Sequence, residues 1–295
     1  MDIKQLRYYT EVVKCGSYTK AAENLNVTQP MLTRTVKQLE DELEVKLIER
    51  NSKCFLPTDA GSELYQNACS LLLQYKDIYR SIGDIRSRKK GKVSISIPGV
   101  ILDMYFPMIL KRFYEEYPNI DISVIEEGSK AVAASVFAGD VDLGIVMLPV
   151  PELSQLGYTV LIKSVCKLLT SKEHPFAHRN KVRLAELKNE RLITFGDTAT
   201  LHDELIAQCR KEGFIPHIAY KSLMPGFDVK MVSYGLGIAV LPSPVIQWYK
   251  AKGLREISTV PEIPWEMAII YKKGRYQSFA AEQMLRFIQD FFIIP

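Results

Sequence analysis

The side chains best suited to chemistry in this 295-residue chain lie near its amino terminus, where hydrogen-bond donors recur three and four positions apart. On a helical wheel, Thr33, Arg34 and Lys37 share one face. The opposite face is an apolar stripe made of Leu32, Val36, Leu39 and Leu43. Such a stripe can hold a helix to its domain while the polar face stays free, which is how a helix that reads a DNA duplex is built.

Two further helices must position this face. Residues 3–15 carry apolar side chains at helical spacing, and Ser17 can cap a second helix that runs to Leu25. Asn26-Val27 gives a short turn, after which Thr28 can cap the third helix and Pro30 fits into its first turn. This order predicts a helix-turn-helix. An ordinary three-helix packing unit is the alternative.

Residues 47–56 form two short extended runs around a polar tip. We interpret them as a wing whose Arg50 and Lys53 contact phosphates, and a solvated hairpin is the alternative. Charge favours the wing, because residues 1–92 hold 16 lysines and arginines against 12 acids, whereas residues 93–295 hold 22 of each. The predicted DNA-contacting residues are Ser17, Tyr18, Thr28, Gln29, Pro30, Thr33, Arg34, Lys37, Arg50 and Lys53.

A long helix follows the segment from Thr58 to Gly61. Its apolar residues keep a strict heptad spacing, which typically pairs one helix with another, so we expect a dimer-forming linker. Packing against its own chain is the alternative. The basic residues between Arg86 and Lys92 are interpreted as a solvated hinge. The predicted dimerisation residues are Leu64, Ala68, Leu71, Tyr75, Ile78, Ile82 and Ile85.

Strands and helices alternate after Lys92. Val93, Ile95 and Ile97 alternate with serines, and this first strand leads into a helix that ends near Tyr117. Such alternation predicts parallel sheets covered on both faces, in two α/β lobes of roughly 100 residues each. Further strands are expected at residues 120–125, 141–147, 166–170, 192–195, 238–241 and 265–271, and further helices at 130–138, 201–212, 227–234 and 278–291.

The cleft between the lobes is the expected ligand site, because sheets of this kind bind ligands where strands end and helices begin. Helix-terminal amides with few titratable groups favour a small anion such as a carboxylate. If Ser129 does not bind the effector, its alternative role is to cap a helix. The alternative role for His202 is a cap at the protein surface. The predicted effector-binding residues are Pro98, Gly99, Val100, Ser129, Leu201, His202, Met224, Pro225 and Phe227.

Composition excludes several classes. The chain is 47% apolar, no apolar run reaches membrane-spanning length and no signal peptide is visible, so we expect a cytoplasmic protein without a membrane partner. The five cysteines are scattered, as in reduced thiols, although a redox switch at Cys166 or Cys209 is an alternative. No metal-spaced histidine pair, phosphate loop or nucleophile elbow occurs. We therefore expect no metal, no cofactor and no catalytic residues, and a small-molecule enzyme with a DNA-binding head is the alternative function.

Together these motifs resemble the LysR-type transcriptional regulators, and the resemblance covers the whole chain. Glu44 departs from it where the family usually has glycine, and Ile48 where it usually has phenylalanine. Looser signatures continue at Phe113, Tyr117-Pro118, residues 139–142 and residues 232–242. The specific matches are residues 16–22, Thr28-Gln29-Pro30, Leu39-Glu40 through Arg50, and residues 56–61.

The resemblance implies an α/β protein with a winged helix-turn-helix at residues 1–58, a linker helix at 59–90 and an effector-binding domain like a periplasmic binding protein at 91–295. Lobe I would comprise about 91–163 and 265–295, and lobe II about 164–264. Such regulators bind dyad-symmetric promoter sites as homodimers or homotetramers and respond to a small-molecule effector. RNA polymerase is a further candidate partner. Activation and repression both remain open.

Within the family, short matches in the second lobe are similar to the CidR-like regulators of Gram-positive bacteria. That branch responds to carbon overflow metabolites and controls holin-like genes, so the resemblance implies acetate or pyruvate as the effector. The matches are residues 199–203, Cys209, Gly213-Phe214 and Ile263-Pro264-Trp265.

Overall fold

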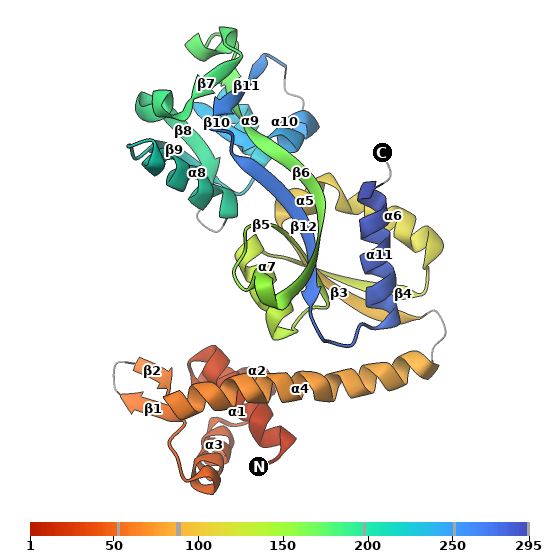
Figure 1. Ribbon diagram of the computed structural model, residues 1–295. Helices are drawn as coiled ribbons and strands as arrows, with labels where there is room; N and C mark the ends of the chain where they lie inside the picture. The colour runs from red at the N-terminus through yellow and green to blue at the C-terminus, as the bar shows by residue number, and fades with distance from the viewer. Residues whose placement is uncertain (52–53, 87–89, 197–198, 250–251, 294–295) are drawn as a thin grey trace. The chain divides into compact units, whose positions relative to one another are not determined.

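The computed structural model describes residues 1–51, 54–86, 90–196, 199–249 and 252–293. The chain divides into two compact units, Met1–Arg86 and Ser87–Pro295, each of which is described by itself (Figure 1). No helix among the described residues is long and apolar enough to cross a membrane.

The first unit is a three-helix domain with a β-hairpin and a long helix. Asp2 and Gln5 form a capping box at the first helix, which ends at Gly16 with a φ of 58°. Ser17 caps the second helix through the amide of Lys20, as predicted. Thr28, in contrast, makes no side-chain capping bond within the described part of the chain. The elements are α1 (Ile3–Cys15), α2 (Tyr18–Leu25), α3 (Gln29–Leu43), β1 (Ile48–Asn51), β2 (Cys54–Pro57) and α4 (Asp59–Arg86).

The apolar stripe predicted for the third helix enters the core of this unit at Leu32, Val36 and Leu39, but Leu43 in the last turn is 37% exposed, so the prediction is wrong at that residue. Leu32 and Leu39 are fully buried, and Tyr9 of α1 packs in the same cluster. The Tyr9 hydroxyl donates a 2.7 Å hydrogen bond to the carbonyl of Gly61, at the start of α4. A side chain at Gly61 would overlap the backbone carbonyl of Leu47. The stripe therefore holds α3, while Tyr9 and Gly61 join α1 to α4.

The second unit has two α/β lobes (Figure 1). Lobe I holds β3 (Gly91–Ile97), α5 (Gly99–Met104), α6 (Phe106–Glu116), β4 (Ile120–Glu126), α7 (Ser129–Ala138), β5 (Leu143–Leu148), η1 (Leu153–Gln155) and α11 (Phe279–Ile293). Lobe II holds η2 (Pro175–His178), β7 (Lys181–Arg183), η3 (Leu184–Asn189), β8 (Arg191–Phe195), α8 (Thr200–Lys211), β9 (His217–Ser222), α9 (Pro225–Ser233), β10 (Ile238–Pro242), α10 (Ser243–Tyr249) and β11 (Leu254–Val260). The long strands β6 (Leu156–Ser171) and β12 (Pro264–Lys272) belong to both lobes.

The prediction of parallel sheets is wrong in part. Strand β3 pairs in parallel with β4 and β5, and β8 pairs in parallel with β9 and β10. The two long strands, however, pair with each other and with β5, β10 and β11 in antiparallel fashion. The segment predicted at residues 166–170 is only the second half of the 16-residue β6. Most residues of its first half, from Tyr158 to Lys163, are partly buried or exposed, so no buried apolar run marks that half as a strand.

One buried group in lobe II is a carboxyl rather than an apolar side chain. Asp228 of α9 is 0% exposed, and neither carboxylate oxygen has a hydrogen-bond partner among the residues described. Burial raises the pKa of this carboxyl from 3.8 to about 8. At neutral pH the folded protein therefore keeps a proton that the unfolded chain has released. The free energy of unfolding consequently falls as pH rises through this window.

Replacing Asp228 with asparagine should raise the free energy of unfolding near neutral pH and flatten its pH dependence, because an amide has no charge to bury. At about 1.4 kcal/mol per pH unit, the wild type should lose roughly 4 kcal/mol between about pH 5 and pH 8. Urea unfolding from about pH 5 to pH 8 measures this. Asp121→Asn, which alters an exposed carboxylate, is the matched control. Parallel pH profiles for the wild type and Asp228→Asn would contradict the account.

Candidate functional site

The outer face of α3 is the candidate DNA-reading surface. Arg34 and Lys37 are exposed on it, as the sequence predicts, and Thr33 is half-buried. Gln29 donates a 2.9 Å side-chain hydrogen bond to the Thr33 hydroxyl, which positions both residues at the start of the helix. Thr28 and Pro30 are also exposed at this end. Arginine, glutamine and threonine side chains can all make hydrogen bonds to base edges.

The hairpin beside this surface is the predicted wing. Strands β1 and β2 pair in antiparallel register, and Phe55 of β2 packs edge-on against Tyr18 of α2 at 5.5 Å between ring centroids. Ser17 and Tyr18 are half-buried at the start of α2. The side chain of Arg50 and the whole of Lys53 lie outside the described residues. Their predicted phosphate contacts therefore stay predictions.

Glu40 connects the reading helix to the wing and was not singled out from the sequence as a site residue. Its carboxylate is 5% exposed, accepts the amides of Leu47 and Ile48 at 3.0 and 3.4 Å, and pairs with Lys46 at 3.1 Å. Burial alone raises the pKa of this carboxyl, but these hydrogen bonds outweigh burial and lower it. The ionised carboxylate thus fixes the end of α3 against the hairpin.

The heptad seam of α4 has two parts. Leu64 and Ala68 pack into the core of their own unit, where Ala68 is 2% exposed. Leu71, Tyr75 and Ile78 are 42%, 41% and 56% exposed. The side chains of Ile82 and Ile85 fall outside the description. The first part of the seam therefore serves the domain itself, and the exposed part remains the candidate dimer surface.

Between the two lobes lies a cavity of about 330 Å³. Five of the nine predicted effector-binding residues line it, namely Pro98, Gly99, Val100, Ser129 and Leu201. The other four, His202, Met224, Pro225 and Phe227, are not in its wall. Residues that were not predicted to bind the effector complete the lining: Glu126, Glu127, Gly128, Met147, Phe195, Ala199, Thr200, Leu223, Pro242, Val245 and Trp265.

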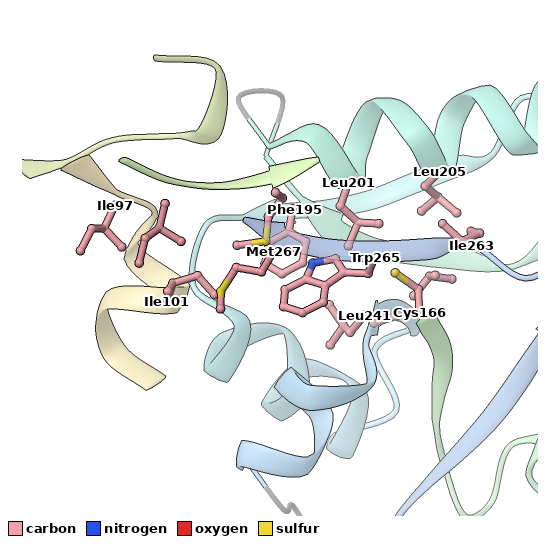
Figure 2. Packing of buried hydrophobic residues seen from close by; sticks show 14 of the residues in the cluster. Ile97, Ile101, Cys166, Phe195, Leu201, Leu205, Leu241, Ile263, Trp265 and Met267 are labelled. Carbon is pink, nitrogen blue, oxygen red and sulfur yellow. The ribbon is translucent and has the colours of Figure 1, made fainter. Parts of the chain in front are cut away.

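Much of this wall is apolar. Figure 2 shows Trp265 and Met267 projecting from β12 among Phe195, Leu201 and Leu241. Trp265 is 4% exposed, so the indole is held rigidly by the shared core of the two lobes. Sequence patterns indicated a strand here but gave no signal that Trp265, near its start, borders a cavity.

Two helices begin at the cavity and supply its hydrogen-bond donors. Ser129 is the first residue of α7 and Thr200 the first of α8, so the unsatisfied amides of both helices lie beside the cavity. The Ser129 hydroxyl accepts the Met147 amide at 3.0 Å. The Thr200 hydroxyl is buried and has no partner among the described residues. A buried hydroxyl without a partner is costly. A ligand that accepts or donates a hydrogen bond at Thr200 would remove this cost, so the start of α8 favours ligand binding.

The expectation of few titratable groups at the cavity is wrong, because Glu126 and Glu127 both line it. Glu127 accepts hydrogen bonds from the hydroxyls of Ser96 and Ser135 at 2.9 and 3.0 Å, which fixes its carboxylate. A side chain at Gly99 would overlap a carboxylate oxygen of Glu126, so that carboxylate lies against the loop after β3. Sequence reasoning passed over both residues because acids at a strand end are usually solvated.

Two polar contacts join the lobes near the cavity. Lys130 of α7 pairs with Asp203 of α8 at 2.5 Å. Tyr249 of α10 donates a 2.9 Å hydrogen bond to Asp103 of α5. Burial and the neighbouring Asp103 carboxylate raise the pKa of Tyr249 to about 12, so this phenol keeps its proton at neutral pH.

The cysteine thiols lie away from the cavity wall in the described structure. Cys166 and Cys209 are 1% and 0% exposed. Burial, with nearby glutamates, raises the pKa of Cys166 to about 12 and that of Cys209 to about 11. In the described part of the chain, no group of histidine, cysteine or acidic residues could hold a metal ion.

Comparison with known proteins divides the chain into the same two units. Residues 3–62 match the model of the bacterial regulatory helix-turn-helix protein, lysR family, and residues 86–292 match the LysR substrate binding domain. The chain is 36% identical to YwbI, an HTH-type transcriptional regulator of Bacillus subtilis, over 100% of this chain and 98% of the relative.

Solved structures show the same fold. An H2O2-bound cysteine mutant of OxyR from Corynebacterium glutamicum is 25% identical with a TM-score of 0.59, over 99% of this chain and 94% of that one. CbnR complexed with its target DNA is 21% identical with a TM-score of 0.54, over 99% of this chain and 100% of that one. The peroxide in the first of these raises the question of whether the thiols of this chain react with peroxide.

Native Cys166 and Cys209 should resist hydrogen peroxide and thiol reagents, because only the thiolate reacts and both thiols are buried and protonated. We expect modification at least about a hundredfold slower than in the unfolded chain. Peptide mapping by mass spectrometry after brief exposure near pH 7.5 measures this, and the guanidinium-unfolded protein is the control. Equal rates in the folded and unfolded states would support the redox switch instead.

Proposed function

The chain belongs to the LysR family of bacterial transcriptional regulators, and on that premise we propose how its two units divide the work. The first unit binds dyad-symmetric promoter DNA through α3 and the wing. The second changes DNA binding or transcription when a small effector fills the cavity between its lobes. The observation that carries the proposal is the Thr200 hydroxyl at the start of α8, which lies in the wall of that cavity and has no hydrogen-bond partner among the described residues.

The DNA-binding part rests on the exposed cations of α3. Arg34 and Lys37 extend from a helix that is anchored on its other side by buried leucines and at its end by Glu40. A helix fixed in this way can enter a major groove with its amino-terminal residues towards the bases. Arginine at such a position can make bidentate contacts to guanine, and we assign Lys37 to a phosphate, which lysine binds as a point charge.

Two copies of this unit would read the two halves of a dyad site. The exposed apolar residues of α4, with Tyr75 and Tyr79 in edge contact at 5.3 Å, support pairing of α4 with a second copy. Dimers and tetramers both suit a dyad-symmetric site. RNA polymerase remains a proposed partner, through the promoter that the protein binds.

The proposed effector is a small carboxylate, with acetate and pyruvate as the first compounds to test. The beginnings of α7 and α8 supply amides and hydroxyls as donors for the carboxylate, and the apolar wall accepts a short carbon chain. Because acetate and pyruvate have few atoms, we expect them to bind with modest affinity, with a Kd in the roughly micromolar to millimolar range. Regulation requires that the ligand bind two lobe arrangements with different affinity.

The DNA-binding proposal is tested by Arg34→Ala. We expect specific binding to weaken by about 1 to 3 kcal/mol and the preference for the promoter over random duplex to shrink. Lys37→Ala should weaken binding to both duplexes alike, since a phosphate contact carries no sequence information. Fluorescence anisotropy at fixed salt measures both. Lys111→Ala, an exposed charge of α6, is the control. Equal losses on both duplexes for Arg34→Ala would make Arg34 a phosphate contact.

The effector proposal is tested by Thr200→Val, which removes the hydroxyl and keeps the shape. Calorimetry on the full chain with acetate and pyruvate should show binding that the variant weakens about tenfold, the usual cost of one lost hydrogen bond. Thr170→Val is the matched control, because the Thr170 hydroxyl is also buried without a partner in the described structure but lies outside the cavity wall. Unchanged binding by Thr200→Val, or no binding of any small acid, would contradict the proposal.

A further inference from the structure

We propose that Glu126 and Glu127 make the cavity selective for a ligand that carries a protonated amine beside its carboxylate, such as an amino acid with a short apolar side chain. We call these two residues the acidic wall. The inference rests on the proposed effector site and deepens it, because it names the class of small carboxylate that the site accepts.

The charge of the cavity wall is the first observation. The acidic wall contributes two carboxylates, whereas no lysine, arginine or histidine stands among the described residues that line the cavity. Lys130 is adjacent in sequence to Ser129, but its ammonium pairs with Asp203 at 2.5 Å. Its charge is therefore already compensated by a carboxylate outside the lining.

Hydrogen bonds fix Glu127 of the acidic wall, and Glu126 is exposed beside it. Two serine hydroxyls hold Glu127, and the Glu126 carboxylate lies against Gly99, where any side chain would overlap it. Both residues immediately precede Gly128 and Ser129, where α7 begins. The acidic wall and the donors of α7 consequently border the same small volume of about 330 Å³.

The start of α8 points independently to a ligand. Thr200 is 8% exposed, its hydroxyl is without a partner among the described residues, and it borders the cavity at the start of the 12-residue α8. A hydroxyl and helix-terminal amides suit a ligand carboxylate. That carboxylate would lie in the same small space as the two carboxylates of the acidic wall.

Electrostatics then decides between ligand classes. A plain monocarboxylate adds a third negative charge beside the two carboxylates of the acidic wall, and a dicarboxylate adds a fourth, so both should bind less tightly than a ligand that also carries a cation. An ammonium group on the ligand meets the acidic wall while its carboxylate meets Thr200 and the helix amides. The apolar side chain of such a ligand would contact Trp265, Phe195 and Met147.

Calorimetry on the full chain with pairs of compounds that differ only in the amine tests this inference. Alanine against propionate and 2-aminobutyrate against butyrate are the pairs, with succinate as the dicarboxylate. We expect each amine-bearing compound to bind at least about tenfold more tightly than its partner, a difference of about 1.4 kcal/mol. Succinate should bind most weakly.

Variants then assign the preference to the acidic wall. Glu126→Gln should reduce the preference for the amine several-fold and strengthen propionate binding. Glu127→Gln is a second variant in case the first perturbs the loop around Gly99. Glu115→Gln, an exposed acid of α6, is the control and should change nothing.

The outcomes separate this inference from the proposed function. If plain acids bind as tightly as their amine-bearing partners, selectivity for an amine is overturned while the carboxylate site stands. If the amine is preferred but neither glutamine variant changes the preference, the acidic wall is not its cause and the inference fails. If neither class binds the wild type, the proposed effector site itself fails.

Discussion

The antiparallel pairing of β6 with β12 is the constraint on which the effector-binding unit depends. Leu156 to Val165 pair with Lys272 to Pro264, and β6 then continues to Ser171 to pair with β10 and β11 of lobe II. One continuous pair of strands thus belongs to both lobes and fixes the side on which they face each other. Trp265 lies at the start of β12 and borders the cavity because of this pairing.

Around that pair, the polar groups fall into two kinds. Some are satisfied and structural, as where Glu40 holds the hairpin or Ser96 and Ser135 hold Glu127. Others are buried and unsatisfied among the described residues, such as the Thr200 hydroxyl at the cavity and the Asp228 carboxyl of α9. A fold carries few groups of the second kind because each one is costly. Thr200 can gain a partner when a ligand binds, and Asp228 avoids the larger cost of a buried charge by keeping a proton.

The sequence predicted those features that depend on local periodicity. The reading helix, its exposed Arg34 and the two lobes follow from spacing within single elements. The sequence predicted less about features that depend on contacts between distant segments. Two such features are the antiparallel pairing of β6 and the burial of only the first part of the α4 seam. Glu126 and Thr200 were missed for the same reason. Nothing local distinguishes an acid at a strand end or a threonine at a helix start from a solvated one.

The central claim is that the ligand occupies the cavity between the lobes, and methionine methyl resonances test it most directly. Met147 lines the cavity, whereas Met108 is 44% exposed on α6 and lies outside the cavity wall. In the full chain labelled with ¹³C-methyl methionine, titration with alanine or acetate should shift the Met147 resonance saturably and leave Met108 in place. A ligand that binds by calorimetry but leaves Met147 unmoved would contradict the account.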